Sequence, residues 1–123
     1  MLKRLQNLLL LVFAVSTLAT GCSKNEIPND IPECVQEKIQ AIIDGPAWDP
    51  PARCIEYDYL NRTVYYFPQE PFCCNNTSEA FNSNCELVCN PDGGENGLGD
   101  GQCPDFYQLA SGGVIVWEDS REP

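Results

Sequence analysis

Eight cysteines carry most of the chemistry that this sequence of 123 residues makes possible. In an oxidising compartment, such a density in a small domain predicts disulfides. A zinc site would need thiolates at short spacings such as Cys-x-x-Cys. The nearest match, Cys85 with Cys89, has no histidine to assist it, because the chain contains none. The six disulfide candidates are Cys34, Cys73, Cys74, Cys85, Cys89 and Cys103.

Cys54 is the candidate free thiol, because the seven cysteines after Cys22 are an odd number and one of them should stay unpaired. The residues after it alternate between acidic and aromatic side chains. Glu56 and Asp58 share the side of the predicted strand on which Cys54 lies, which indicates that this face is exposed to solvent. A thiol there is free to meet a partner chain or a small thiol. The alternative is that a loop buries it. Cys73 and Cys74 are adjacent, so each is expected to bond a different part of the chain.

The segment from Asn90 to Asp105 combines five glycines with four carboxylates. Calcium takes six to eight oxygen ligands from a chain that can wrap around the ion, so a structural calcium site is one interpretation of this segment. In a twelve-residue calcium loop starting at Asp92, however, Cys103 occupies the place of the bidentate glutamate. The favoured interpretation is therefore a solvated, turn-rich loop clamped by Cys103, with a structural calcium site as the alternative and no other cofactor expected. The candidate calcium ligands are Asp92, Glu95, Asn96 and Asp100.

Charge and composition exclude several classes of function. Residues 1–21 are predicted below to be a removable signal peptide. All 18 acidic residues but only five of the seven basic ones follow it, so the net charge of the mature chain is 5 − 18 = −13. This charge argues against a nucleic-acid partner. Without histidine there is no Ser-His or Cys-His nucleophile pair, and no two carboxylates stand out as acid and base. We expect a non-catalytic binding or interaction module; the alternatives are a carboxylate-dependent hydrolase and a purely structural lipoprotein.

Residues 1–21 predict a bacterial lipoprotein signal peptide. Lys3 and Arg4 precede an unbroken apolar run from Leu8 to Val15, which is too short to span a membrane. The ending Ala19-Thr20-Gly21-Cys22 resembles the lipobox of bacterial lipoproteins, which implies cleavage before Cys22 and lipid on its sulfur. An ordinary secretory signal is the alternative.

Acyl chains on Cys22 would hold the protein on a membrane without any apolar protein surface. Residues 22–30 then form a tether, and residues 31–120 form a single disulfide-rich domain. The expected location is the cell envelope, lipid-anchored at the outer membrane, facing either the periplasm or the outside. The expected partners are the membrane and an unknown protein or glycan.

A helix is predicted to open the domain. Asp30 can cap it, apolar residues recur at helical spacing from Ile31 to Ile42, and Gly45 followed by Pro46 ends it. The polar residues Glu37, Lys38 and Gln40 lie on its outer side, and Cys34 lies at the margin of the apolar stripe. The helix is therefore expected to pack on another element.

Arg53 to Phe67 predicts a hairpin with the two-residue turn Asn61-Arg62. One face of this hairpin collects Ile55, Tyr57, Tyr59, Val64 and Tyr66, and it is the expected core face. The other face includes Tyr65 and Phe67. Cover by the cysteine-rich loop is expected for them, because monomers seldom expose large apolar patches. If they are exposed, they are a candidate binding surface.

A last strand from Gly113 to Glu118 is expected to join the hairpin, because two strands alone are marginally stable. The predicted class is α+β: one N-terminal helix packed on a small antiparallel sheet, formed by the hairpin and the C-terminal strand. Residues 68–106 are expected to form an irregular lobe held by disulfides.

Several of these motifs together resemble a domain of unknown function found in short cysteine-rich lipoproteins of Bacteroidota. The most specific part is the run from Gly97 to Phe106, which ends in Cys-Pro-Asp-Phe. The aromatic end of the hairpin, the Cys73-Cys74 pair and the closing Val116-Trp117 also resemble it. Cys54 looks like an addition to a six-cysteine pattern. The resemblance implies an envelope location and the fold, but it implies no mechanism.

Overall fold

The computed structural model describes residues 26–71 and 76–123. The described residues form an α+β fold with one antiparallel sheet of five strands, in the order β4-β3-β2-β1-β5. The predicted class is therefore confirmed. The elements are α1 (Glu33–Asp44), β1 (Arg53–Tyr59), β2 (Arg62–Phe67), β3 (Glu79–Asn82), β4 (Leu87–Cys89), α2 (Phe106–Leu109) and β5 (Ser111–Glu118).

Helix α1 forms where its apolar spacing predicts it, and Val35 and Ile39 are buried along the stripe. Its predicted cap is wrong. The residue before the first turn is Pro32, which makes no side-chain cap hydrogen bond. Its carbonyl oxygen instead accepts the backbone N–H groups of Val35 and Gln36. Pro32 suits this position because its fixed φ is compatible with entry into a helix and its missing N–H is no loss there.

The β1–β2 hairpin turns one residue earlier than predicted. Tyr59 pairs with Arg62, so the turn residues are Leu60 and Asn61, both with positive φ. The predicted turn, Asn61-Arg62, is therefore wrong. Asn61 tolerates the left-handed conformation. The earlier turn also places Arg62 in β2, where it avoids the steric cost of a positive φ. The partner of each β1 residue lies two positions earlier along β2 than predicted. Because side chains alternate between faces, a shift of two leaves each side chain on its predicted face.

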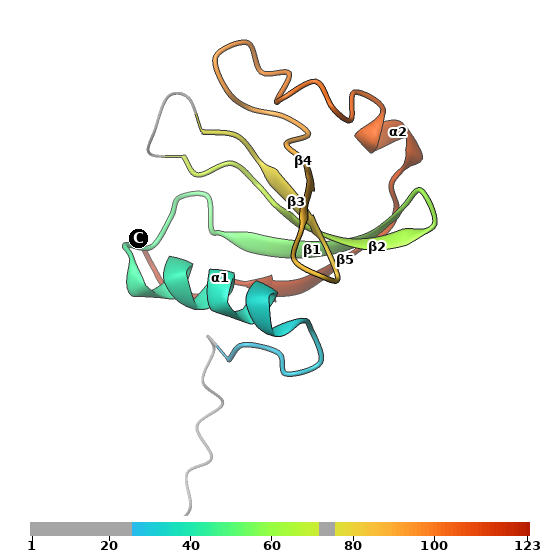
Figure 1. Cartoon of the computed structure of the whole chain (residues 1–123). Helices are drawn as coiled ribbons and strands as arrows, with labels where there is room; N and C mark the ends of the chain where they lie inside the picture. The colour runs from blue at the N-terminus through green and yellow to red at the C-terminus, as the bar shows by residue number, and fades with distance from the viewer. Residues whose placement is uncertain (1–25, 72–75) are drawn as a thin grey trace, which may run out of the picture.

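Both faces of the sheet are covered, by different parts of the chain (Figure 1). Helix α1 packs against one face, in a cluster that includes Val35, Ile39, Tyr65, Phe67 and Trp117. The segment that follows β4, with α2, covers the other face. There the buried cluster is Ile55, Tyr59, Val64, Tyr66, Ala80, Cys89, Cys103 and Phe106.

Two strands within residues 68–106 were not predicted. Residues of β3 pair with β2, and Ala80 of β3 pairs with Cys89 of β4. These strands are only four and three residues long, too short for a clear alternation in the sequence. The rest of the segment is irregular, as expected. Gly99 is required there: a Cβ at this position would lie 1.8 Å from the carbonyl oxygen of Asn90, and its φ is +65°.

The last strand, β5, pairs with β1 as predicted, and it begins two residues earlier, at Ser111. The pairing is irregular: Cys54 faces Trp117 and Ile55 faces Ile115, so Val116 lies in a bulge. Gly113 allows Tyr57 to cross the strand, because a Cβ there would lie 2.7 Å from the ring.

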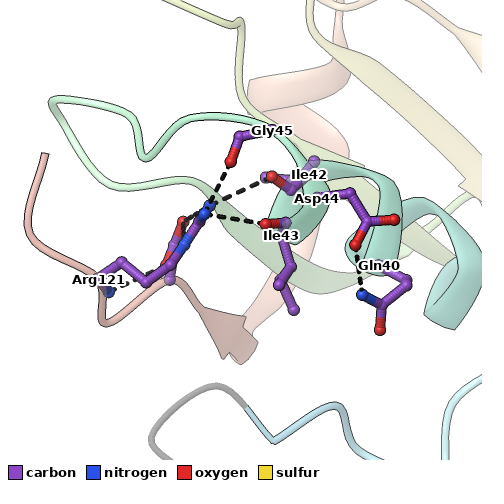
Figure 2. Close-up of polar contacts among 7 residues, drawn as sticks. Gln40, Ile42, Ile43, Asp44, Gly45 and Arg121 are labelled. Atoms are coloured by element: carbon purple, nitrogen blue, oxygen red, sulfur yellow. Dashed lines mark hydrogen bonds and ion pairs between the residues drawn. The ribbon is translucent and has the colours of Figure 1, made fainter.

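The chain ends beside the C-terminal end of α1, where Arg121 caps the helix (Figures 1 and 2). Its Nη1 donates to the carbonyl oxygens of Ile43 and Gly45, at 2.9 and 2.7 Å, and its Nη2 donates to that of Ile42 at 3.2 Å. Asp119, which is buried, holds the same guanidinium at 2.8 Å. A cation here satisfies carbonyl groups that the helix leaves unpaired and favours its negative end.

Asp119→Asn should lower the melting temperature at pH 7 by about 4 °C, a small effect because solvent screens the partly exposed Arg121. Hydrogen bonds from Arg121 lower the pKa of the Asp119 carboxyl below its ordinary value of 3.8. Its stabilising effect is therefore complete above pH 3.8 and is lost as the pH falls through the lower, folded-state pKa. Thermal unfolding of both proteins from pH 2 to pH 7 measures this. A difference in melting temperature that stays constant across this range would contradict it.

Candidate functional site

A groove of about 360 Å³ lies between the second half of α1 and the neighbouring ends of β2 and β3. We call it the α1 groove. Ala41, Ile42, Pro46 and Phe67 form part of its wall. Its polar and aromatic lining is Lys38, Trp48, Glu70, Asn76, Thr77 and Glu79. The volume falls within the usual range for small-molecule sites, about 300 to 1,000 Å³.

Lys38 is held in place at the edge of the groove. Its Nζ lies 2.8 Å from Oε1 of Glu79. The same ammonium group lies over two aromatic rings, 5.3 Å from the centroid of Phe67 and 5.2 Å from that of Phe81. Contact with the negative faces of two rings and with a carboxylate restricts a side chain that is otherwise flexible. Lys38 is therefore not the freely solvated residue that its place on the outer side of the helix predicted.

The rest of the polar and aromatic lining comes mainly from segments without regular structure. Nδ2 of Asn76 donates to Oε2 of Glu70 at 3.3 Å. Trp48 is half-buried and lies in the connection that begins where Gly45 ends α1. The groove thus places an indole ring together with two pairs of hydrogen-bonding side chains. Such an arrangement can stack an apolar surface and bind polar groups at its edges.

Tyrosine hydroxyls and aspartates form a second polar cluster, on the opposite face of the sheet. Tyr107 donates to Oδ2 of Asp92 at 2.5 Å, and its hydroxyl lies 2.7 Å from that of Tyr66. Burial, followed by the hydrogen bond to Asp92, raises the pKa of Tyr107. Tyr59 donates to Asp105 at 2.9 Å. These bonds attach the segment after β4 to the sheet, so the cluster has a structural role.

The predicted calcium ligands have other partners. Asp92 accepts the tyrosine hydroxyls, Asp100 accepts the backbone N–H groups of Asn90 and Gln102, and Asn96 accepts that of Leu98. Glu95 is exposed. Within residues 26–71 and 76–123, no group of three or more acidic, cysteine or histidine side chains could hold a metal ion. A structural calcium site stays a prediction.

Among the six disulfide candidates, the structure pairs Cys34 with Cys85 and Cys89 with Cys103. The first bond ties α1 to the turn between β3 and β4, and the second ties β4 to the segment before α2. Cys73, Cys74 and the lipidation candidate Cys22 lie outside the described residues.

Cys54 is a free thiol, but its predicted place on a wet face is wrong. It is fully buried, because α1 covers this side of the sheet. Burial, followed by the nearby charge of Glu56, raises the pKa of the thiol to about 12. Since the thiolate is the reactive form, Cys54 is unreactive toward a partner chain or a small thiol in the folded protein.

Tyr65 and Phe67 do not form an exposed aromatic surface, and Phe67 contributes instead to the wall of the α1 groove. Their side chains are 6% and 3% exposed, respectively. They are covered as expected, but α1 provides the cover, not the cysteine-rich loop. The α1 groove could not be recognised in the sequence. Trp48 next to the helix end was its only local signal, since Lys38 and Glu79 are 41 residues apart.

A model of a protein family described as "Domain of unknown function (DUF6970)" matches residues 40–119. The match includes every strand but starts within α1. No curated protein and no solved structure matches the chain. In the described part of the chain, no helix is both long and apolar enough to cross a membrane.

Proposed function

Because the chain belongs to the DUF6970 family, whose description names no activity, we propose a function from its geometry. The protein is a lipid-anchored, non-catalytic module of the cell envelope that binds a neutral glycan in the α1 groove. The observation that carries this proposal is the half-buried ring of Trp48 in one groove with the pairs Lys38–Glu79 and Asn76–Glu70.

The lining suits a sugar better than an apolar ligand. A pyranose ring has an apolar C–H face that can lie on an indole, and hydroxyl groups at its rim that both donate and accept hydrogen bonds. Lys38 and Asn76 supply donors, whereas Glu70 and Glu79 supply acceptors. Because the partner of each side chain already fixes its position, little conformational entropy is lost on binding.

The charges favour a neutral glycan over an anionic one. Lys38 is the single basic side chain in the lining and is paired with Glu79, while Glu70 adds a second negative charge. The mature chain as a whole carries 5 − 18 = −13, so an anionic polymer would be repelled on approach.

The anchoring part of the proposal rests on the sequence. The motif Ala19-Thr20-Gly21-Cys22 and the apolar run before it support acylation of Cys22. Acyl chains there, with residues 22–30 as a tether, would place the α1 groove close to a membrane surface, within reach of envelope glycans.

The arrangement of carboxylates supports binding over hydrolysis. Glycoside hydrolysis needs one carboxyl group that keeps its proton and a second that acts as base or nucleophile. In the groove, Glu79 is engaged by Lys38 and Glu70 by Asn76. We therefore assign these carboxylates to ligand binding.

A glycan array probed with the full-length chain in detergent tests the proposal. The array should hold neutral, anionic and cationic oligosaccharides, and we expect binding to neutral ones. Trp48→Ala should weaken binding about fivefold, because an aromatic platform is worth about 1 kcal/mol. Leu109→Ala is the control, since Leu109 is a 49% exposed apolar residue outside the groove. It should leave binding unchanged.

Three results would contradict the proposal. These are no binding to any glycan, equal losses in the Trp48 and Leu109 variants, and release of a cleaved sugar, which would indicate a hydrolase. The anchor is tested separately: Cys22→Ser should move the chain from the membrane to the soluble fraction. Retention of this variant on the membrane would overturn the anchoring but leave the glycan site intact.

A further inference from the structure

The two disulfides in the described part of the chain differ in their access to solvent. Cys89 and Cys103 are buried, with 1% and 4% of their surface exposed. Cys34 and Cys85 are only partly buried, and both line an open hollow of about 270 Å³. Thiol–disulfide exchange needs an attacking thiolate to reach a sulfur atom. Of the two bonds, Cys34–Cys85 is therefore the one that a reductant can reach.

We propose that the Cys34–Cys85 bond is a redox-sensitive switch that controls the α1 groove. A dithiol, such as the Cys-x-x-Cys pair of a thiol oxidoreductase, reduces the bond, and the reduced chain then binds the groove's ligand more weakly. The effect on ligand binding rests on the function proposed above, whereas the reduction of the bond does not.

The surroundings of the bond favour Cys34 as the leaving thiolate. Cys34 is the second residue of α1, where the helix dipole and the free backbone N–H groups stabilise negative charge. Lys38 lies one turn further along α1 and lines the same hollow. Exchange is faster when the leaving thiol has a low pKa, so attack on Sγ of Cys85 is favoured. Solvent screens the charges of the exposed carboxylates in the adjoining sequence, which are Glu33, Glu37 and Glu86.

The exchange passes two electrons from the dithiol to the bond. The first thiolate of the dithiol attacks Sγ of Cys85 and forms a mixed disulfide, while the original S–S bond breaks and its electron pair leaves on Sγ of Cys34. The second thiolate of the dithiol then attacks the dithiol's own sulfur in the mixed disulfide and releases Cys85. The dithiol ends as a disulfide, and its two protons end on the thiols of Cys34 and Cys85.

Lys38 connects the bond with the groove, because it lines both the α1 groove and the hollow beside the bond. Its contacts with Glu79 and Phe81 join α1 to β3, and the disulfide joins α1 to the turn that follows β3. Reduction removes the covalent tie, and a partly exposed ion pair contributes little by itself. The first turns of α1 then move more freely against β3, so Lys38 loses its fixed position in the groove.

Brief treatment of the native full chain with dithiothreitol, followed by alkylation and peptide mass spectrometry, tests the switch. Cys34 and Cys85 should be alkylated about tenfold faster than Cys89 and Cys103. Hydrogen exchange should then become about tenfold faster at the backbone amides of α1 and stay unchanged in the β1–β2 hairpin. The affinity for the neutral oligosaccharides should fall about fivefold, the effect of losing one hydrogen bond from Lys38.

Two double variants separate the bonds. Dithiothreitol should still lower the affinity when Cys89→Ser is combined with Cys103→Ser. It should have no further effect when Cys34→Ser is combined with Cys85→Ser, because that variant already lacks the switch. A cooperative thermal transition shows that each variant, and the reduced chain itself, is folded.

The switch is overturned if all four cysteines react at the same rate, or if the chain unfolds on reduction. It is also overturned if exchange in α1 does not change, or if the folded Cys34 and Cys85 variant still responds to dithiothreitol. Equal affinities of the oxidised and reduced chains would likewise contradict it. A chain that binds no glycan in either state overturns the proposed function instead, and selective reduction with faster exchange in α1 then still supports the switch.

Discussion

Replacing Cys34 and Cys85 together with serine should lower the free energy of unfolding by about 4 kcal/mol. The bond between them closes a loop with a sequence separation of 51 residues, and constraint of the unfolded chain grows with loop length. The Cys89–Cys103 bond closes a separation of 14, for which the same relation gives about 3 kcal/mol. Urea unfolding of the full chain and of both double variants at 25 °C measures the two losses.

The order of the two losses is the informative result. If the shorter loop costs more than the longer one, or if either loss is below about 1 kcal/mol, then these bonds do not stabilise the domain by constraining its unfolded state. A loss of about 4 kcal/mol is a large share of the stability of a small domain. If the first variant is already unfolded without urea, the second still provides a measurable transition.

Phe106→Ala should lower the free energy of unfolding by about 3 to 5 kcal/mol. The ring is 1% exposed and contacts four others, with centroid distances of 5.6 Å to Tyr57 and Tyr66, 5.1 Å to Tyr59 and 5.4 Å to Tyr107. Its removal leaves a cavity between the sheet and the segment after β4. Chemical unfolding monitored by tyrosine fluorescence measures the loss.

Leu109→Ala is the matched control for Phe106. Leu109 ends the same short helix, α2, but is 49% exposed, so its truncation should change the free energy of unfolding by about 0.5 kcal/mol or less. If the two variants lose similar amounts, the segment after β4 is not packed on the sheet as described.

The parts of the fold with a strong local pattern could be predicted from the sequence. Helix α1 has a regular apolar stripe, and the hairpin alternates over many residues, so the sequence correctly predicts which side chains share a face. The short strands β3 and β4 could not be recognised, because three or four residues do not establish an alternation. Their position depends on pairing with β2, which the sequence does not state.

The element that covers Cys54, Tyr65 and Phe67 could not be predicted from the sequence. Glu56 and Asp58 suggested a wet face, but α1 covers this side of the sheet and buries the apolar members of the strands. Alternation shows which side chains share a face, whereas it does not show which element covers that face. The α1 groove was missed for a similar reason, because its lining combines α1, the connection after it and the start of β3.

The central claim is that the α1 groove binds a glycan, and the chain has two tryptophans that test it directly. Trp48 lines the groove, whereas Trp117 is buried at 4% exposure between β5 and α1. Nuclear magnetic resonance resolves their indole N–H signals during titration with the neutral oligosaccharides that bind on the array. The account predicts a saturable shift of the Trp48 signal and an unchanged Trp117 signal. An unchanged Trp48 signal under saturating sugar would contradict it.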